Sequence, residues 1–197
     1  MNIIPSLIAT AASIAIAISV HEFGHAYSAH LLGDDTAKLT GRMTLNPLKH
    51  VDPIGLLALI IFRIGWAKPV PVNPMNYKNY KIGNLIVSLA GIVFNLITAI
   101  ICAIIYSNSQ LYGVQLLTYT CIIYNIGFAA FNLLPIPPLD GWGIIETFVP
   151  YKWNNYLYKI ESVSGIILIV FIITGAYRII INPIHSLFIN IVQMFMF

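Results

Sequence analysis

Hydrophobic positions in this sequence gather into long, nearly uninterrupted runs separated by shorter polar segments. Four runs reach the roughly 20 mostly apolar residues that a helix needs to cross a bilayer: about 4–32, 84–106, 113–135 and 162–182. A fifth run, 54–64, is too short to cross and contains Arg63, so we expect it to be re-entrant or interfacial. The tail, 184–197, is apolar but also short. The pattern predicts an all-α polytopic membrane protein with about four transmembrane helices.

Turn-forming residues mark the ends of these runs and the longest polar region, 33–83. We expect the first helix to end at Gly33. Alternating prolines in 68–74 exclude a helix or a central strand but suit an extended segment. The third helix should be broken by Pro135, Pro137 and Pro138. Broken backbone at membrane depth persists only where protein or a water-filled cavity surrounds it, so this run is a candidate site.

The composition agrees with a membrane protein and disfavours a soluble one. The chain has 197 residues, of which 58% are hydrophobic and 9% are charged, whereas about 25% of the residues in an ordinary soluble domain are charged. No repeat or low-complexity segment divides it, so we expect a single domain over 1–197. A cleaved N-terminal signal peptide is disfavoured, because no Lys or Arg precedes the first apolar run.

The position of the basic residues predicts the orientation in the membrane. Of the formal net charge of +3, most positive side chains lie in the 33–83 and 136–160 loops. The positive-inside rule places these loops in the cytoplasm of a multi-pass cell-membrane protein. This topological use explains the basic residues more simply than a nucleic-acid-binding face, so we expect no nucleic-acid partner.

One motif in the first helix carries recognisable chemistry. Residues 21–25 match H-E-x-x-H, in which His21 and His25 share one helical face and can reach one ion. Glu22 is then placed to act on water beside the metal. Ionisable residues inside an apolar helix are costly and are by default a functional hypothesis. The alternative is a polar patch that packs helices together.

A third metal ligand must come from elsewhere in the chain, because a catalytic zinc usually has three protein ligands and one open position. The extended H-E-x-x-H-x-x-G-x-x-H pattern fails, since Ser28 and Leu31 stand at its last two fixed positions. His30 points away from the pair. Asp140, which follows the broken third helix, is the candidate. Its alternative role is to cap a helix that starts near Gly141. A His₂Asp site would also accept other divalent ions.

The two motifs fall on the same side of the membrane under one topology. His21 and His25 precede Gly33 by roughly 12–18 Å at about 1.5 Å per helical residue. Asp140 lies just beyond the cytoplasmic end of the third helix, and the broken backbone could fold back to that depth. We therefore expect the site toward the cytoplasmic side.

These residues carry a family resemblance. H-E-F-G-H in the first helix together with N-L-L-P-I-P-P-L-D-G after the third resembles the site-2 protease family of intramembrane metalloproteases. Residues 41–47 and 65–74 look like its compact branch without a PDZ domain. The resemblance implies that His21, His25 and Asp140 bind Zn²⁺ and that Glu22 is the catalytic acid and base. It implies hydrolysis of peptide bonds in or near the transmembrane segments of membrane-protein substrates, as in regulated intramembrane proteolysis.

The second core helix departs from the family pattern at one position. The family often has G-P-x-x-N there, whereas this chain has Ile92 between Gly91 and the matching Asn95. This substitution puts a local kink in question but not the metal site. Asn95 and Asn132 could donate hydrogen bonds to a substrate or a developing oxyanion. Hydrogen bonding between helices is the alternative for both.

Two other functions and one substrate-binding hypothesis stay open. A metal transporter would place ionisable residues along a path across the membrane, whereas here they cluster toward one face. A non-catalytic protein that holds membrane proteins would not need Glu22. The proline-rich 66–74 segment could hold an unwound substrate by strand addition.

Overall fold

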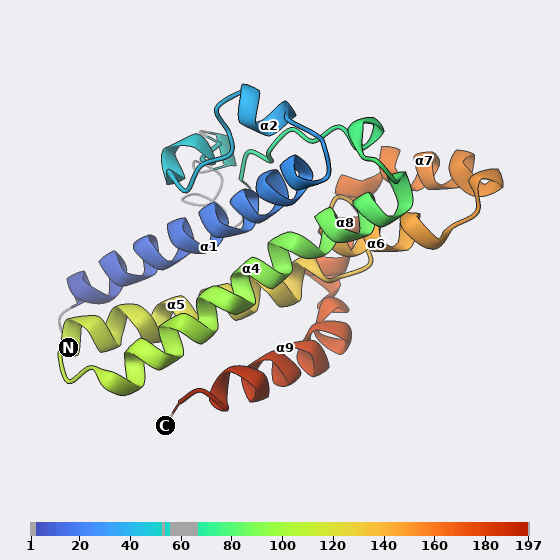
Figure 1. The fold of residues 1–197 in the computed structure, drawn as a ribbon. Coiled ribbons are helices and arrows are strands. Elements are labelled where there is room, and N and C mark those ends of the chain that lie inside the picture. Colours follow the sequence, from blue (N-terminus) through green and yellow to red (C-terminus); the bar gives the residue numbers. More distant parts are fainter. Residues whose placement is uncertain (1–2, 53, 56–66, 197) are drawn as a thin grey trace.

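The computed structural model describes residues 3–52, 54–55 and 67–196. In this part of the chain the regular elements are helices, apart from one isolated bridge between Val51 and Ala67. Among the described residues, three helices are long and apolar enough to cross a membrane: α1 (Ile3–Leu31), α4 (Tyr80–Asn108) and α5 (Tyr112–Asn132). Each packs against the other two, and Figure 1 shows them side by side. The expected all-α membrane fold is confirmed.

Small residues allow these helices to approach closely. The core between α4 and α5 is built on alanines that are completely buried, Ala99 and Ala103 on α4 and Ala129 and Ala130 on α5. Small side chains are typical of helix contacts in membranes, where lipid gives no hydrophobic drive for association. Isoleucines on α4 are exposed instead, and a continuous exposed apolar surface of this kind is typical of lipid contact: Ile97, Ile101, Ile104 and Ile105.

The fourth expected span, 162–182, is wrong as a single helix. The chain forms α7 (Asn154–Ser162), α8 (Ser164–Thr174) and α9 (Tyr177–Gln193) instead. Gly175 has φ +71°, a left-handed conformation that ends a helix and that residues with a side chain avoid. The stretch Tyr151–Ser162 and α8 bend by 62°, and together they could make a fourth, broken span.

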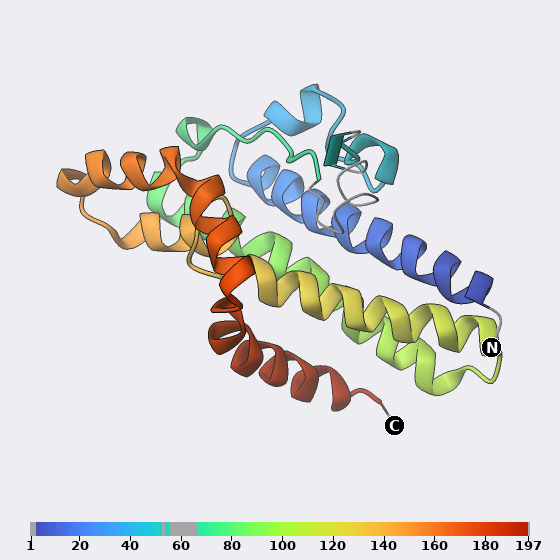
Figure 2. The same ribbon diagram turned by 180° about the vertical axis from the view of Figure 1, so that it is seen from behind.

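The apolar tail is not separate from this region, because α9 includes most of it. Phe188 and Val192 of α9 are buried in the same core as α4 and α5. Figure 2 shows α9 running back along the bundle, so that both chain termini lie at the end opposite α7.

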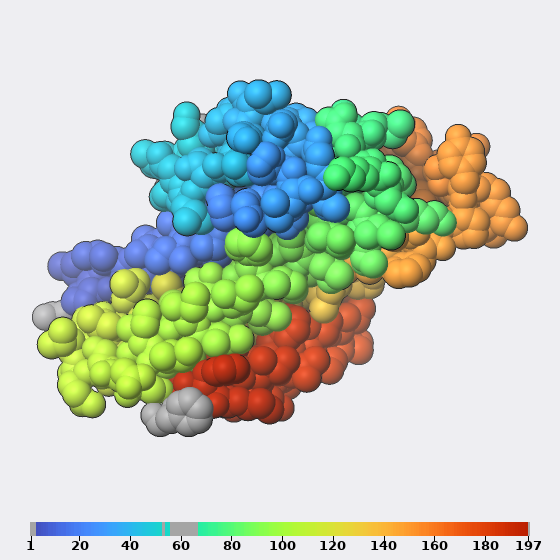
Figure 3. Space-filling model, in the orientation of Figure 1, coloured from blue at the N-terminus to red at the C-terminus, as the bar shows by residue number. Residues whose placement is uncertain are grey.

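Between α1 and α4 the chain forms short helices and an extended segment. They are α2 (Thr36–Leu39), η1 (Pro47–Lys49) and η2 (Pro74–Asn76), and residues 68–73 between η1 and η2 are extended, as expected. α1 ends just before Gly33, which has φ +105°, so the predicted helix end is confirmed. This region lies over the C-terminal half of α1 (Figure 3). The re-entrant expectation for 54–64 lies almost entirely outside the described residues.

The expected break after the third helix is also present. α5 ends at Asn132, residues 133–139 turn back, and α6 (Asp140–Phe148) and η3 (Tyr151–Trp153) follow. The turn is tight, because a Cβ atom on Gly141 would lie 2.3 Å from the carbonyl oxygen of Leu134. Only glycine fits this approach, which returns the start of α6 to the bundle, where it packs against α4.

Candidate metal centre

Two histidines of α1 form one wall of the site. His21 and His25 are one helical turn apart and buried, with 3% and 9% exposure. Their Nε2 atoms lie 3.0 Å apart. The ring of Phe128 on α5 packs edge-on against His21, with ring centres 4.9 Å apart. The H-E-x-x-H spacing therefore brings both imidazoles to one point inside the helix bundle.

Asp140 reaches the same point from α6. Its Oδ2 atom lies 3.2 Å from Nε2 of His21 and 3.3 Å from Nε2 of His25. The capping alternative does not describe this side chain, because Leu139 occupies the N-cap position and no side chain caps the helix there. One ligand atom from each of the three residues falls within 4.8 Å of the others, a grouping that could hold a metal ion.

The hydrogen bonds of Asn95 fix the protonation of His21. Asn95 Nδ2 donates to the carbonyl of Ala17 and to Oδ1 of Asn125, both at 2.9 Å. Its Oδ1, 2.8 Å from Nδ1 of His21, is therefore an acceptor. Nδ1 of a neutral His21 must carry the proton, which leaves a lone pair on Nε2.

The same reasoning applies to His25. Its Nδ1 lies 2.7 Å from the carbonyl oxygen of Val87, which can only accept. Nε2 of a neutral His25 is then also unprotonated. Two nitrogen lone pairs and Oδ2 of Asp140, which is buried and has no hydrogen-bond partner among the described residues, thus converge with no proton between them. Buried acceptors in such a group require a cation, so these residues fit a bound metal.

One face of α4 supports both imidazoles. Val87, Gly91 and Asn95 follow at intervals of four residues, so they share a face. A Cβ atom on Gly91 would lie 2.5 Å from Nε2 of His25 and from Cε1 of His21. Glycine therefore provides the space for the rings. Ile92 stands where the family that the chain resembles often has proline. α4 continues as a helix through Ile92, which is buried in the core, so the absence of the proline does not interrupt this helix.

Glu22 lies beside this group without belonging to it. It is buried, and its Oε2 accepts a hydrogen bond of 2.7 Å from the backbone N–H of Val70. Val70 belongs to the extended segment between η1 and η2. The carboxylate next to the metal site is thus held by a distant part of the chain.

The remaining polar candidates have other contacts. Asn132 donates to the carbonyl of Phe128 in its own helix, at 3.0 Å. His30 lies at the end of α1, as expected, and pairs there with Asp35. Asn125, which belongs to no motif in the sequence, donates to the carbonyl of Cys121 and orients Asn95. The sequence offers one signal for Asn125, which is an amide side chain inside an apolar run.

Comparison with known proteins identifies similar chains. The chain is 38% identical over 189 residues to "Putative zinc metalloprotease YwhC" of Bacillus subtilis (strain 168), covering 90% of this chain and 85% of that one. It is 31% identical over 181 residues to "Putative zinc metalloprotease Rip2" of Mycolicibacterium smegmatis, covering 82% and 65%. The Rip2 protein of Mycobacterium tuberculosis (strain H37Rv) is 28% identical over 167 residues, covering 79% and 62%. No family model and no solved structure matches the chain.

Proposed function

Since this chain belongs to the site-2 protease family of zinc metalloproteases, we propose that it hydrolyses peptide bonds in or near the transmembrane segments of other membrane proteins. The observation that carries the proposal is the convergence of His21, His25 and Asp140 beside a buried Glu22, on helices apolar enough to cross a membrane. In this proposal the substrates are transmembrane proteins, and their cleavage is part of regulated intramembrane proteolysis.

In this proposal the two histidines and the aspartate bind the zinc. Three protein ligands would leave room at the metal for water or substrate, as in catalytic zinc sites. Bound there, zinc supplies a Lewis acid that polarises a carbonyl and lowers the pKa of water from about 15.7 to about 7. Asn95 and Val87 hold the two imidazoles in the tautomer that leaves Nε2 available.

Glu22 moves the proton. The carboxylate takes a proton from the attacking water and transfers it to the leaving amine, so one residue acts first as base and then as acid. Its Oε2 accepts the hydrogen bond from the N–H of Val70, and we assign Oε1 to the water. The backbone contact therefore sets the direction in which the carboxylate faces.

An oxyanion forms during the attack and needs a donor. Both N–H groups of the Asn95 amide are engaged by Ala17 and Asn125, so we assign Asn95 to the support of His21 rather than to the substrate. Asn132 is the better candidate, because among the described residues its amide makes one hydrogen bond, to the carbonyl of Phe128 within α5. Donors aimed at the developing charge lower the reaction barrier.

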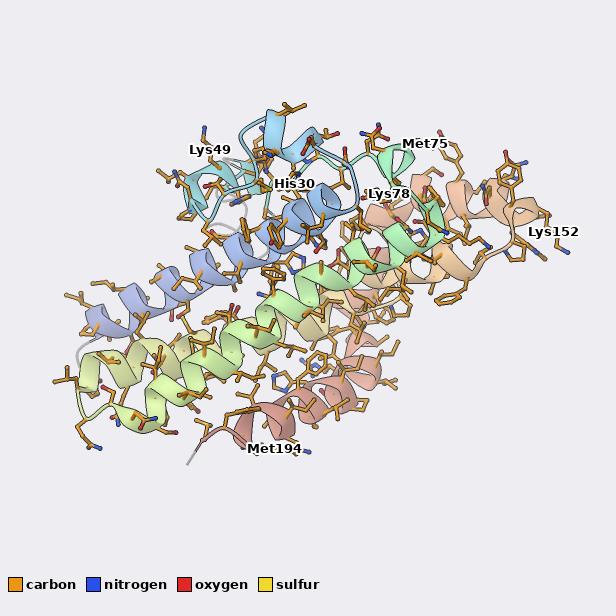
Figure 4. All side chains as sticks on the ribbon, viewed as in Figure 1. His30, Lys49, Met75, Lys78, Lys152 and Met194 are labelled. Atoms are coloured by element: carbon orange, nitrogen blue, oxygen red, sulfur yellow. The ribbon has the colours of Figure 1, made fainter. Side chains whose placement is uncertain are left out.

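The site is proposed to face the cytoplasm in the cell membrane. Lys78 and Lys152 project at the end of the bundle opposite Met194 (Figure 4). Basic loops remain in the cytoplasm under the positive-inside rule. Water would reach Glu22 from this side, and the substrate helix would have to unwind before its backbone becomes accessible.

The competing function is a zinc-binding membrane protein that holds or transports a ligand without cleaving it. Cleavage of a single-span substrate by the purified protein in detergent distinguishes the two. We expect wild type to cleave, and Glu22→Gln to retain zinc but not cleave. Glu161→Gln is the control and should cleave, because Glu161 lies on α7 and accepts a hydrogen bond from Trp142, away from the metal ligands. Retained zinc in a wild-type protein that cleaves none of a broad set of substrates would support the competing function.

A further inference from the structure

The extended segment of residues 68–73, here called the strap, crosses α1 beside Glu22. It is fixed to the rest of the molecule by hydrogen bonds near both ends and in the middle. We propose that Arg42 and Asp34 are positioning residues for peptide hydrolysis, because they secure the strap so that the Val70 N–H orients the Glu22 carboxylate. This inference rests on the proposed function of Glu22.

Arg42 secures the first part of the strap. Its side chain is buried, with 8% exposure, and Nη2 donates to the carbonyl oxygens of Lys68 at 2.7 Å and of Pro69 at 3.2 Å. Among the described residues Arg42 forms no salt bridge. A buried guanidinium is costly unless its donors are satisfied, so these two carbonyls are its main compensation. They immediately precede Val70.

Asp34 secures the other end. It is completely buried just after the end of α1, and its Oδ2 accepts a hydrogen bond of 2.6 Å from the N–H of Asn73. Its Oδ1 accepts from the Asn76 amide at 2.8 Å and from the Thr36 N–H at 3.1 Å. Burial alone would raise the pKa of Asp34, but these donors lower it below its ordinary value. Asp34 is thus a charged acceptor that ties the strap to α1.

Apolar contacts place the middle of the strap. Val70 is buried against Ala26 of α1 and Ala37 of α2, and Val72 packs against the same cluster. Ala26 follows His25 directly in the sequence. Alanine at these positions lets the strap lie close to α1, within reach of Glu22. The strap therefore contacts the site through the backbone N–H of Val70, whose position depends on the hydrogen bonds that Arg42 and Asp34 make to the strap.

This arrangement separates the strap from the metal. The three candidate metal ligands lie on α1 and α6, whereas the hydrogen bonds of Arg42 within the described residues go to Lys68 and Pro69 of the strap. Loosening the strap should free the Glu22 carboxylate to rotate while the metal stays bound. The expected signature is a lower kcat with unchanged KM and unchanged zinc.

Hydrogen exchange tests the contact itself. Pro69 and Pro71 have no N–H, so four strap amides can exchange. We expect those of Lys68, Val70 and Asn73 to be slow, because they donate to His50, Glu22 and Asp34. The amide of Val72 has no acceptor in the described part of the chain and should be faster. Arg42→Met should accelerate Val70 at least tenfold; equal rates in wild type and variant would overturn the proposal.

Kinetics test the consequence, with Lys49→Met as the control because Lys49 is an exposed cation of the same loop. A general base contributes about 10²–10⁴-fold to a rate, so its misorientation in Arg42→Met should lower kcat by roughly tenfold or more. Arg42→Lys, which can still donate to a carbonyl, should recover part of this loss. Asp34→Asn is the second variant, in case Arg42→Met does not fold.

The outcomes separate this inference from the proposed function. No cleavage by wild type would reject the proposed function. Cleavage by wild type with an unchanged kcat in both folded strap variants would reject the positioning role alone. A raised KM at constant kcat would show that the strap holds substrate instead, and loss of zinc would show a structural role; each result overturns the proposal.

Discussion

His21 and Asn95 are joined across two membrane helices by a hydrogen bond of 2.8 Å between Nδ1 and Oδ1. The direction of this bond is set by further hydrogen bonds of Asn95 to Ala17 and Asn125. The network determines which imidazole nitrogen faces Asp140. A partner of this kind usually matters almost as much to a metal site as the ligands themselves.

Replacing Asn95 should therefore weaken zinc binding. Asn95→Ala leaves Nδ1 of His21 without its acceptor, and loss of such a partner typically costs about 10–100-fold in metal affinity. Zinc titration against a competing chelator measures the change. Asn108→Ala is the matched control, since in the described part of the chain the Asn108 amide donates to the carbonyl of Ile104 within α4. Equal affinities of Asn95→Ala and wild type would contradict the assigned role.

A methyl group at position 91 should displace the histidines. The Cβ atom of Gly91→Ala would lie 2.5 Å from both imidazole rings, too close for either to remain in place. We expect zinc binding to fall while the helical circular-dichroism signal persists. Gly127→Ala on α5 is the control, because a Cβ atom there meets nothing within 4 Å. Full zinc occupancy in Gly91→Ala would be evidence against the described site.

Acid should release the end of the strap that Asp34 holds. The folded-state pKa of Asp34 is below its ordinary value, so its contribution to stability is present above the unfolded pKa and disappears as pH falls through the folded pKa. Hydrogen bonds to a charged group contribute about 1.5–3 kcal/mol. The difference in thermal stability between wild type and Asp34→Asn should be present at pH 7 and shrink below about pH 4.

The control for that experiment is Asp35→Asn. Asp35 is exposed and pairs with His30 at the surface, so its replacement should have little effect on stability at any pH in this range. A wild-type advantage over Asp34→Asn that persists unchanged through acid would show that the Asp34 charge does not stabilise the strap.

The sequence predicts the helices best where composition alone decides them. The three long spans and the break after α5 follow from uninterrupted apolar runs and clustered prolines. The stretch after residue 162 could not be resolved in this way, because its apolar character continues through Gly175. Only the local left-handed conformation of Gly175 separates α8 from α9.

In the candidate site, too, some contacts could be predicted from the sequence and others could not. Short-range spacing predicts that His21 and His25 share a face, and elimination selects Asp140, which the structure brings to them. The contacts of Val70 with Glu22 and of Asn125 with Asn95 could not be predicted, because each joins residues that are distant in the chain. Whether such residues meet depends on the direction of the backbone and on the rotation of each helix about its axis. No residue pattern encodes those quantities directly.

The most direct test of the central claim measures zinc content and substrate cleavage on the same preparations of wild type, Asp140→Ala and Glu22→Gln. The site predicts one zinc ion per wild-type chain with cleavage, little zinc and no cleavage in Asp140→Ala, and full zinc without cleavage in Glu22→Gln. Full zinc in Asp140→Ala, or cleavage by Glu22→Gln at the wild-type rate, would contradict the account.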